Sequence, residues 1–308
     1  MPSLKTKSAP LIALLLLCLL WACASLRSDL LPGSTPVAQS SPLTSEAIPL
    51  AMFAVIAAVA ASVRKTPWPR GCTLGAMALA GLGLFAAPSV LIEVAERSID
   101  GTTRVALFSL VPVFAVVLEP SLGAASSSPQ RGGLAAGLIA VVGTLLVFPL
   151  ELPQTTAAAF AFGGIVAATA SVAAANCIAV RIASEPAAPS IFGFAAVATG
   201  SAALTLGVLS VLVEHHSWSA SLFDSWIALD LLALAFFFWL LSRMTAVRMT
   251  TRFLVAPLLA NLIGLAFLRP AVQGRGWLGL LLIDVGSGWL LLGPDDEPEE
   301  TNSPLGIR

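Results

Sequence analysis

The chain has 308 residues, of which 57% are hydrophobic and only 11% are charged, with a mean hydropathy of +0.92 and a formal net charge of −1. Soluble globular domains carry roughly 25% charged residues, so this composition excludes a molecule whose whole surface faces water. The scattered Lys and Arg residues form no basic stripe, which argues against nucleic acid as a partner. We therefore expect the lipid bilayer to be the solvent for most of the surface.

Apolar runs recur along the whole chain, and a helix of about 20 apolar residues crosses a hydrocarbon core. They predict an all-α polytopic membrane protein of about ten transmembrane helices. The predicted spans are 9–26, 47–63, 72–92, 105–118, 132–150, 156–180, 190–213, 225–242, 253–268 and 276–292. Because so little chain lies outside these spans, we expect no enzyme activity, no cofactor and no metal site.

The first span follows Lys5 and Lys7, so it is either a retained helix or a secretory signal with a small-residue cleavage site. The bulky Trp21 suits a cleavage region poorly, which favours retention. With this span retained, eleven of the sixteen Lys and Arg residues fall on one side, and the positive-inside rule predicts that both termini are cytoplasmic. We expect the acidic tail, 293–308, to be a solvated cytoplasmic end.

A weak internal repeat divides the chain into halves of five spans each, 9–150 and 156–292. The fourth and ninth spans both have a Thr-Thr-Arg triplet followed by a proline, namely Thr102, Thr103, Arg104 and Pro112, and Thr250, Thr251, Arg252 and Pro257. The fifth and tenth spans have glycines at equal spacing, namely Gly133 and Gly143, and Gly276 and Gly286. An odd number of spans per half places the second half upside down in the membrane. Inverted repeats of this kind are typical of secondary transporters, which bind substrate where the repeats meet.

The fourth and ninth spans are the two shortest runs, and each contains a proline, Pro112 and Pro257. Proline removes a backbone donor and frees a carbonyl one turn earlier. Short or proline-broken spans at matching positions of two halves point to a transport site, whereas a plain helix kink is the alternative for each proline alone.

Four polar residues complete the predicted substrate pathway. Asp284 lies near the middle of the last span, where an ionised side chain is costly, so we expect it to face the bundle interior and couple protons or bind substrate. An acid that only locks helices together is the alternative. Asn261 could bind substrate or bridge helices. Arg104 and Arg252, at the entrances of the fourth and ninth spans, could attract anionic solutes or snorkel to the interface.

The order of these segments resembles the drug/metabolite transporter superfamily, in particular its EamA-like branch. The segments that carry the resemblance are LLCLLWACASL, FSLVPVFAVV, PQRGGLAAGLIAVVGTLLV, VAPLLANLIGLAFLRP and GWLGLLLIDVGSGWLLL. It extends from about Leu11 to Leu292 and implies a bacterial inner-membrane carrier with two five-helix repeats and a central cavity. The Gly-Glu pair of the family repeats is missing at Gly123-Ala124 and at Arg269-Pro270, and Glu119 lies one turn before the first of these sites.

We therefore predict a secondary transporter of amino acids, metabolites or toxic compounds that works by alternating access, with protons as the candidate coupling ion. A nucleotide-sugar-like carrier is the alternative among transporters. A polytopic membrane enzyme or a non-transporting scaffold is the alternative class. An enzyme would need an acid, base or metal cluster at one membrane face, and the sequence contains no such cluster.

Overall fold

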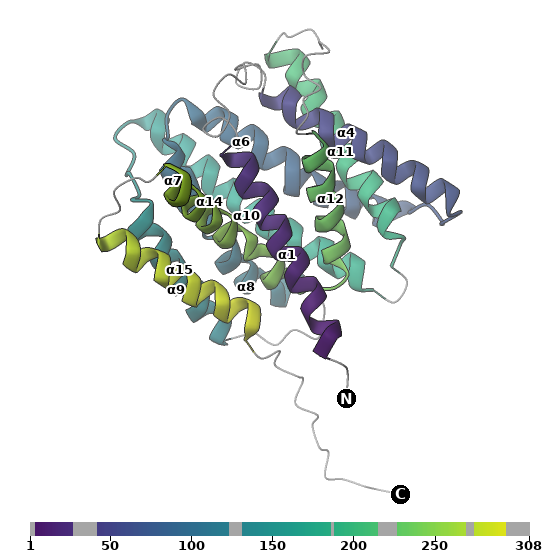
Figure 1. Cartoon of the computed structure of the whole chain (residues 1–308). Helices are drawn as coiled ribbons and strands as arrows, with labels where there is room; N and C mark the ends of the chain where they lie inside the picture. The colour runs from purple at the N-terminus through teal and green to yellow at the C-terminus, as the bar shows by residue number, and fades with distance from the viewer. Residues whose placement is uncertain are drawn as a thin grey trace, which may run out of the picture.

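The computed structural model describes residues 4–26, 42–122, 131–185, 188–214, 227–268 and 274–293, which form helices and short connections without strands (Figure 1). The helices are α1 (Leu4–Ser25), α4 (Pro42–Val63), α5 (Gly71–Gly81), the π-helix η1 (Leu82–Ala86), α6 (Ala87–Glu96), α7 (Gly101–Phe108), α8 (Val111–Leu122), α9 (Arg131–Val147), α10 (Thr156–Ser184), α11 (Ile191–Val213), α12 (Ile227–Leu241), α13 (Ala246–Thr250), α14 (Arg252–Leu268) and α15 (Gly274–Leu292).

Several of these helices join end to end into longer rods. The rods are 71–96 from α5, η1 and α6, 101–122 from α7 and α8 with a break at 109–110, and 246–268 from α13 and α14 with a break at 251. Within the described residues, eight helical segments are long and apolar enough to cross a membrane, and Gly132–Val147 and Ile227–Leu241 are shorter apolar helices. The expectation of an all-helical, multi-pass protein is confirmed.

The fourth and ninth spans are longer than the sequence suggested. Their apolar helices run over Gly101–Leu122 and Ala246–Phe267, whereas the fifth and eighth segments are the short ones. The apolar runs stop at Arg104 and Arg252, but the helices continue past these residues to their N-caps. The prediction that the fourth and ninth spans are the shortest was therefore wrong.

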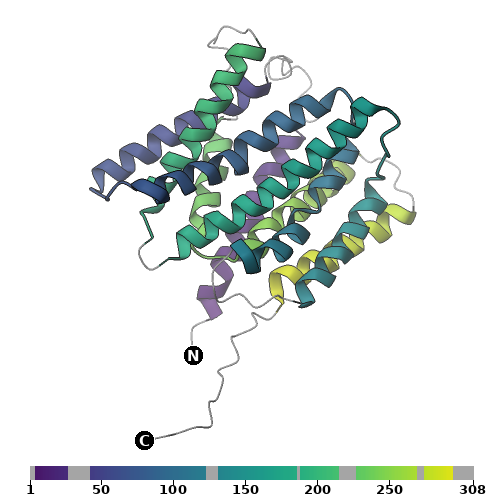
Figure 2. The ribbon, with the colours of Figure 1, turned by 180° about the vertical axis from the view of Figure 1, so that it is seen from behind.

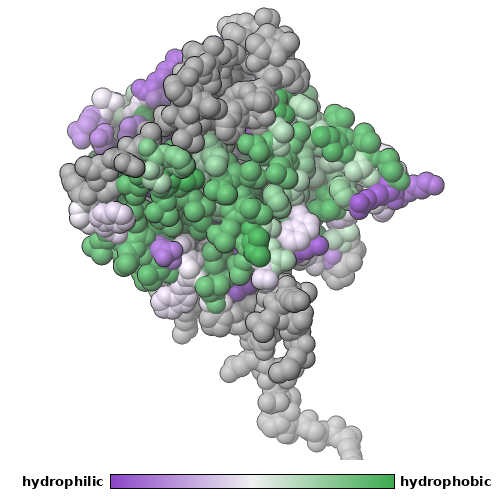
Figure 3. All heavy atoms as spheres, in the orientation of Figure 1, coloured by the Kyte–Doolittle hydropathy of each residue, from purple (hydrophilic) through white to green (hydrophobic). Residues whose placement is uncertain are grey.

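The outer surface is apolar over much of its area. Large hydrophobic side chains are exposed on most of the long helices, for example Val55, Leu79, Phe160 and Leu204. Figure 3 shows hydrophobic residues as a broad area across the middle of one face, with hydrophilic residues mostly toward its edges. Such a surface is unstable in water and fits a hydrocarbon environment.

The helices of the two halves interleave. Helix α4 packs along α11, and α9 packs along α15 (Figures 1 and 2). Helix α10 packs against α8 and α6, and α1 packs against α14 and α12. Helix α1 begins and α15 ends at the same end of the molecule in Figure 1.

Glycines allow α9 and α15 to touch through their backbones. A Cβ atom on Gly143 would lie 2.7 Å from the Gly279 carbonyl oxygen, and one on Gly286 would lie 2.6 Å from the Ala136 carbonyl oxygen. Residue numbers rise along α9 as they fall along α15 in these contacts, so the two helices are antiparallel. Small residues at such crossings replace the hydrophobic effect by close van der Waals packing.

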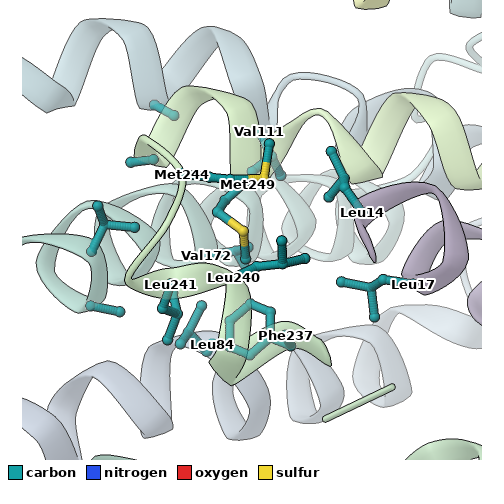
Figure 4. Close-up of a cluster of buried hydrophobic side chains, with 14 of the residues drawn as sticks. Leu14, Leu17, Leu84, Val111, Val172, Phe237, Leu240, Leu241, Met244 and Met249 are labelled. Atoms are coloured by element: carbon teal, nitrogen blue, oxygen red, sulfur yellow. The ribbon is translucent and has the colours of Figure 1, made fainter. Parts of the chain in front are cut away.

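The largest buried apolar cluster fills the bundle around α13. Figure 4 shows its side chains from α1, η1, α8, α10, α12 and α13 converging on Met249, which is fully buried. Met244, Leu240 and Val111 lie in the same cluster. This packing closes the interior of the bundle on the α13 side.

We predict that Gly143→Ala destabilises the protein by about 1–3 kcal/mol, because the added methyl meets the backbone of α15 and forces the two helices apart. Gly288→Ala is the matched control on α15, since a Cβ there meets nothing within 4 Å. Thermal unfolding in detergent measures both. Equal melting temperatures for the two variants would contradict this description of the contact.

Candidate functional site

A cavity of about 980 Å³ lies among α1, α7, α9, α14 and α15, so both halves of the chain line it. Its wall includes Ser25 at the end of α1, Gly101 at the start of α7, Phe148 just after α9 and Gly276 near the start of α15. The cavity therefore reaches the end of the bundle where these helix termini gather. Small-molecule sites typically measure about 300–1,000 Å³, so it can hold an organic solute.

Arg252 lies deep on the wall of this cavity and is only 2% exposed. Its Nη1 donates to Asn176 Oδ1 at 3.1 Å and to the Met249 carbonyl at 2.9 Å, whereas its buried Nε has no hydrogen-bond partner among the described residues. The sequence placed Arg252 at the entrance of the ninth span. The structure places it in the interior, because the rod starts at Ala246, more than a turn earlier.

Three aromatic rings surround the Arg252 guanidinium. Its Cζ lies 4.7 Å from the ring centre of Phe237, 4.8 Å from that of Phe253 and 5.2 Å from that of Trp21. No Asp or Glu among the described residues forms a salt bridge with it. A desolvated cation–π contact contributes about 0.5–2 kcal/mol, and an arginine at a membrane helix centre costs roughly 3 kcal/mol or more. Rings and hydrogen bonds thus stabilise the charge without neutralising it.

Two further arginines line the same cavity nearer its open end. Arg104 is partly buried, and its Nη2 lies 3.5 Å from Glu96 Oε1, while its Nε is buried without a partner among the described residues. Arg275 is exposed at the start of α15. Among the described residues the cavity has three basic side chains and no acidic one on its wall. The field inside it therefore favours anions.

Asp100 fixes the start of the helix that carries Arg104. It is the N-cap of α7 and accepts hydrogen bonds from the backbone N–H groups of Thr102 at 3.1 Å and Thr103 at 3.2 Å. The Thr103 hydroxyl in turn accepts from the Glu151 N–H at 3.1 Å. The hydroxyls of Thr102 and Thr103, followed by their N–H groups, lower the pKa of the Asp100 carboxyl below its ordinary value.

Of the other predicted site residues, Pro257 and Asn261 line the cavity. Asn261 Nδ2 donates to the Pro257 carbonyl at 2.9 Å, one turn back on α14. Pro112 is buried at the second position of α8, directly after the break between α7 and α8, and does not line the cavity.

Asp284 lies outside the cavity, on the exposed side of α15 beside Leu281 and Val285. We expected it to face the bundle interior, and the structure differs. The small residues Gly279 and Gly286 turn the opposite side of α15 toward α9, and this packing directs Asp284 away from the bundle. Hydropathy alone could not reveal this, because α15 is apolar on all sides.

The sequence interpretation missed the aromatic residues of the site. Phe108 and Phe253 stack with ring centres 6.0 Å apart and an interplanar angle of 22°, and both line the cavity. Each stands four residues before a proline, Pro112 or Pro257. The Thr-Thr-Arg triplets do not lie at equivalent places, since the first starts the fourth rod and the second marks the break between α13 and α14 in the ninth.

A smaller cavity of about 300 Å³ lies on the other side of Trp21, which lines both spaces. Its wall carries Glu46 of α4 and Asp230 of α12, together with Phe237. Glu46 is exposed and lines this space. The sequence interpretation did not select either acid, because each lies close to the end of an apolar run.

No family model matches the chain, and no curated protein matches it. A solved structure described only as "Crystal structure of protein" is similar, with a TM-score of 0.71 and 17% sequence identity over 92% of this chain and 98% of that one. At this identity the likeness shows the fold alone. The fold and the apolar surface define a multi-pass α-helical membrane protein.

We predict that Asp100→Asn removes a pH-dependent part of the stability. Because the folded protein lowers the pKa of this carboxyl, its contribution is complete above the ordinary Asp pKa of about 3.9 and is lost as the pH falls through the lowered value. The melting-temperature difference between wild type and variant should therefore be largest near pH 6 and shrink toward about pH 3. A difference independent of pH would contradict this prediction.

Proposed function

We propose that the protein is a secondary transporter of small organic solutes in a bacterial inner membrane, with an EamA-like arrangement of ten helices in two inverted repeats. The observation that carries this proposal is the cavity, which both halves line, which reaches one end of the bundle and which the apolar cluster around Met249 closes toward the other. Alternating access requires a solute site of this kind, accessible from one side at a time.

The helix contacts support the inverted repeat. The proposed repeat pairs each helical segment of the first half with the segment five places later in the second half, so that α1 corresponds to α10, α6 to α12 and α8 to α14. When corresponding segments are exchanged, the packing of α10 on α8 and α6 becomes the packing of α1 on α14 and α12. The same exchange maps the α4–α11 and α9–α15 pairs onto themselves. A two-fold relation between halves produces both kinds of contact.

Individual residues follow the same relation. Exchange of Gly143 with Gly286 and of Gly279 with Ala136 converts one close helix contact into the other. The sequence had paired Gly143 with Gly286 on spacing alone. The stacked Phe108 and Phe253 lie where the fourth and ninth rods meet and are counterparts in the same sense.

The proposed orientation puts both termini in the cytoplasm, as the positive-inside rule predicts. The cavity then opens to the outer face, because Ser25, Gly101 and Gly276 lie at helix ends assigned to that face. Protons are the proposed coupling ion. Since Asp284 faces outward, we now expect the coupling group among Glu46 and Asp230 of the smaller cavity.

Flux into proteoliposomes tests the proposal. Purified protein is reconstituted, a mixed panel of amino acids and other metabolites is offered with an imposed pH gradient, and uptake is followed by mass spectrometry. Selective movement of one solute class is the expected result. Absence of movement for every solute, in either direction of the gradient, would favour an enzyme or a scaffold.

Two substitutions in the second half form a matched pair for this assay. We predict that Asn261→Ala lowers uptake at least about tenfold, because it removes a polar group from the cavity wall. Asp284→Asn should leave uptake unchanged, because Asp284 lies outside the cavity. If Asp284→Asn loses uptake while Asn261→Ala keeps it, then Asp284 and not Asn261 belongs to the solute pathway.

A further inference from the structure

We propose that the cavity is selective for organic anions, with the Arg252 guanidinium as the binding group for a carboxylate or other oxyanion and the surrounding rings as the surface for an apolar body. This inference rests on the proposed function in so far as it names the transported class. The binding itself can be measured without transport.

The first argument is the incomplete bonding of Arg252. A guanidinium has five N–H donors, and both of the hydrogen bonds described for it come from Nη1. None of the hydrogen bonds described for Arg252 uses Nη2, and the buried Nε also has no partner among the described residues, although the residue lines the cavity. Buried polar groups in folded proteins nearly always have partners, so an arginine with unused donors on a cavity wall points to a ligand that supplies the acceptor.

The second argument is charge. The guanidinium keeps its charge in proteins, and here the groups around it are an amide, a carbonyl and aromatic rings rather than a carboxylate. Arg275 adds positive charge toward the open end of the same space, where Arg104 is paired with Glu96. An arginine that served only to lock helices together would bond an acid on a neighbouring helix. Arg252 instead lines the cavity and forms no salt bridge with an acid among the described residues.

The third argument is the chemistry of the remaining wall. Trp21, Phe108 and Phe253 line the cavity beside Arg252, and most other wall residues are aliphatic or glycine. Aromatic faces bury large apolar area, and a planar guanidinium binds oxyanions through paired donors. The combination fits an anion attached to an apolar or aromatic body better than a small hydrophilic ion.

Three probes of nearly equal shape test the charge preference in wild-type protein. They are 4-phenylbutyrate, its neutral amide 4-phenylbutyramide and the cation 4-phenylbutylammonium, titrated against protein in nanodiscs of neutral lipid by calorimetry. We expect the carboxylate to bind at least about tenfold more tightly than either analogue, because a hydrogen-bonded charge pair is lost with them. Equal affinities for the three probes, or no binding of any, would overturn the proposal.

Arg252→Gln should abolish the preference for the carboxylate. Arg243→Gln is the control, because Arg243 also stacks on a ring, that of Trp239 at 4.1 Å, but is exposed and outside the cavity. Should Arg252→Gln fail to fold, Arg275→Gln changes an exposed residue of the cavity wall and should weaken carboxylate binding severalfold, more so at low salt. A folded Arg252→Gln variant that keeps the preference would contradict the assignment.

The source of the anion is tested by adding phosphatidylglycerol to the nanodiscs. If carboxylate affinity stays the same, the site takes soluble anions. If phosphatidylglycerol competes in wild type, the anion site stands and a lipid headgroup occupies it. Failure of carboxylate binding together with flux of neutral solutes would overturn this inference alone, whereas binding without any flux would overturn the transport proposal alone.

Discussion

The burial of one arginine that forms no salt bridge with any acid in the described part of the chain is the constraint on which the site depends. Arg252 is 2% exposed, and its charge is stabilised by Asn176, the Met249 carbonyl and three aromatic rings. Each of these interactions fixes an element: Asn176 ties α10 to α14, and the rings of Trp21 and Phe237 bring in α1 and α12. The same residue lines the cavity for which we propose an organic anion as the ligand.

The bundle combines close-packed contacts with interrupted helices. The glycine contact of α9 with α15 brings backbones together and resists sliding, as close packing generally does. By contrast, the rods that line the cavity are broken at Ser109 and Leu110 and again at Thr251, next to Phe108 and Arg252. Helix breaks of this kind are where discontinuous transporter helices change shape around a bound solute. Under the proposed transport function, we expect the fourth and ninth rods to move while the α9–α15 pair stays rigid.

Much of the architecture could be predicted from the sequence, because membrane helices leave a strong hydropathy signal. The ten predicted spans overlap helical segments, of which eight among the described residues are long and apolar enough to cross a membrane. The depth of individual side chains in the bundle, and the side of each helix that faces the interior, could not be predicted. A hydropathy pattern stops at a charged residue, so Arg252 was predicted to lie at the entrance of its span. A helix with apolar residues on every side gives no sign of which side faces the interior, so Asp284 was predicted to face inward. Both depend on tertiary packing of small residues and rings.

Accessibility of Gly264 is the most direct measurement of the central claim, that one cavity between the halves is reached from one side at a time. Gly264 lines the cavity, and a Cβ there meets nothing within 4 Å, so Gly264→Cys has room for its side chain and can be placed in a background where the four native cysteines are replaced by similar small residues. The account predicts that a membrane-impermeant maleimide labels it from the outer face at rest and from the inner face only during solute exchange. Equal labelling from both faces at rest would contradict the account, because it would indicate an open channel.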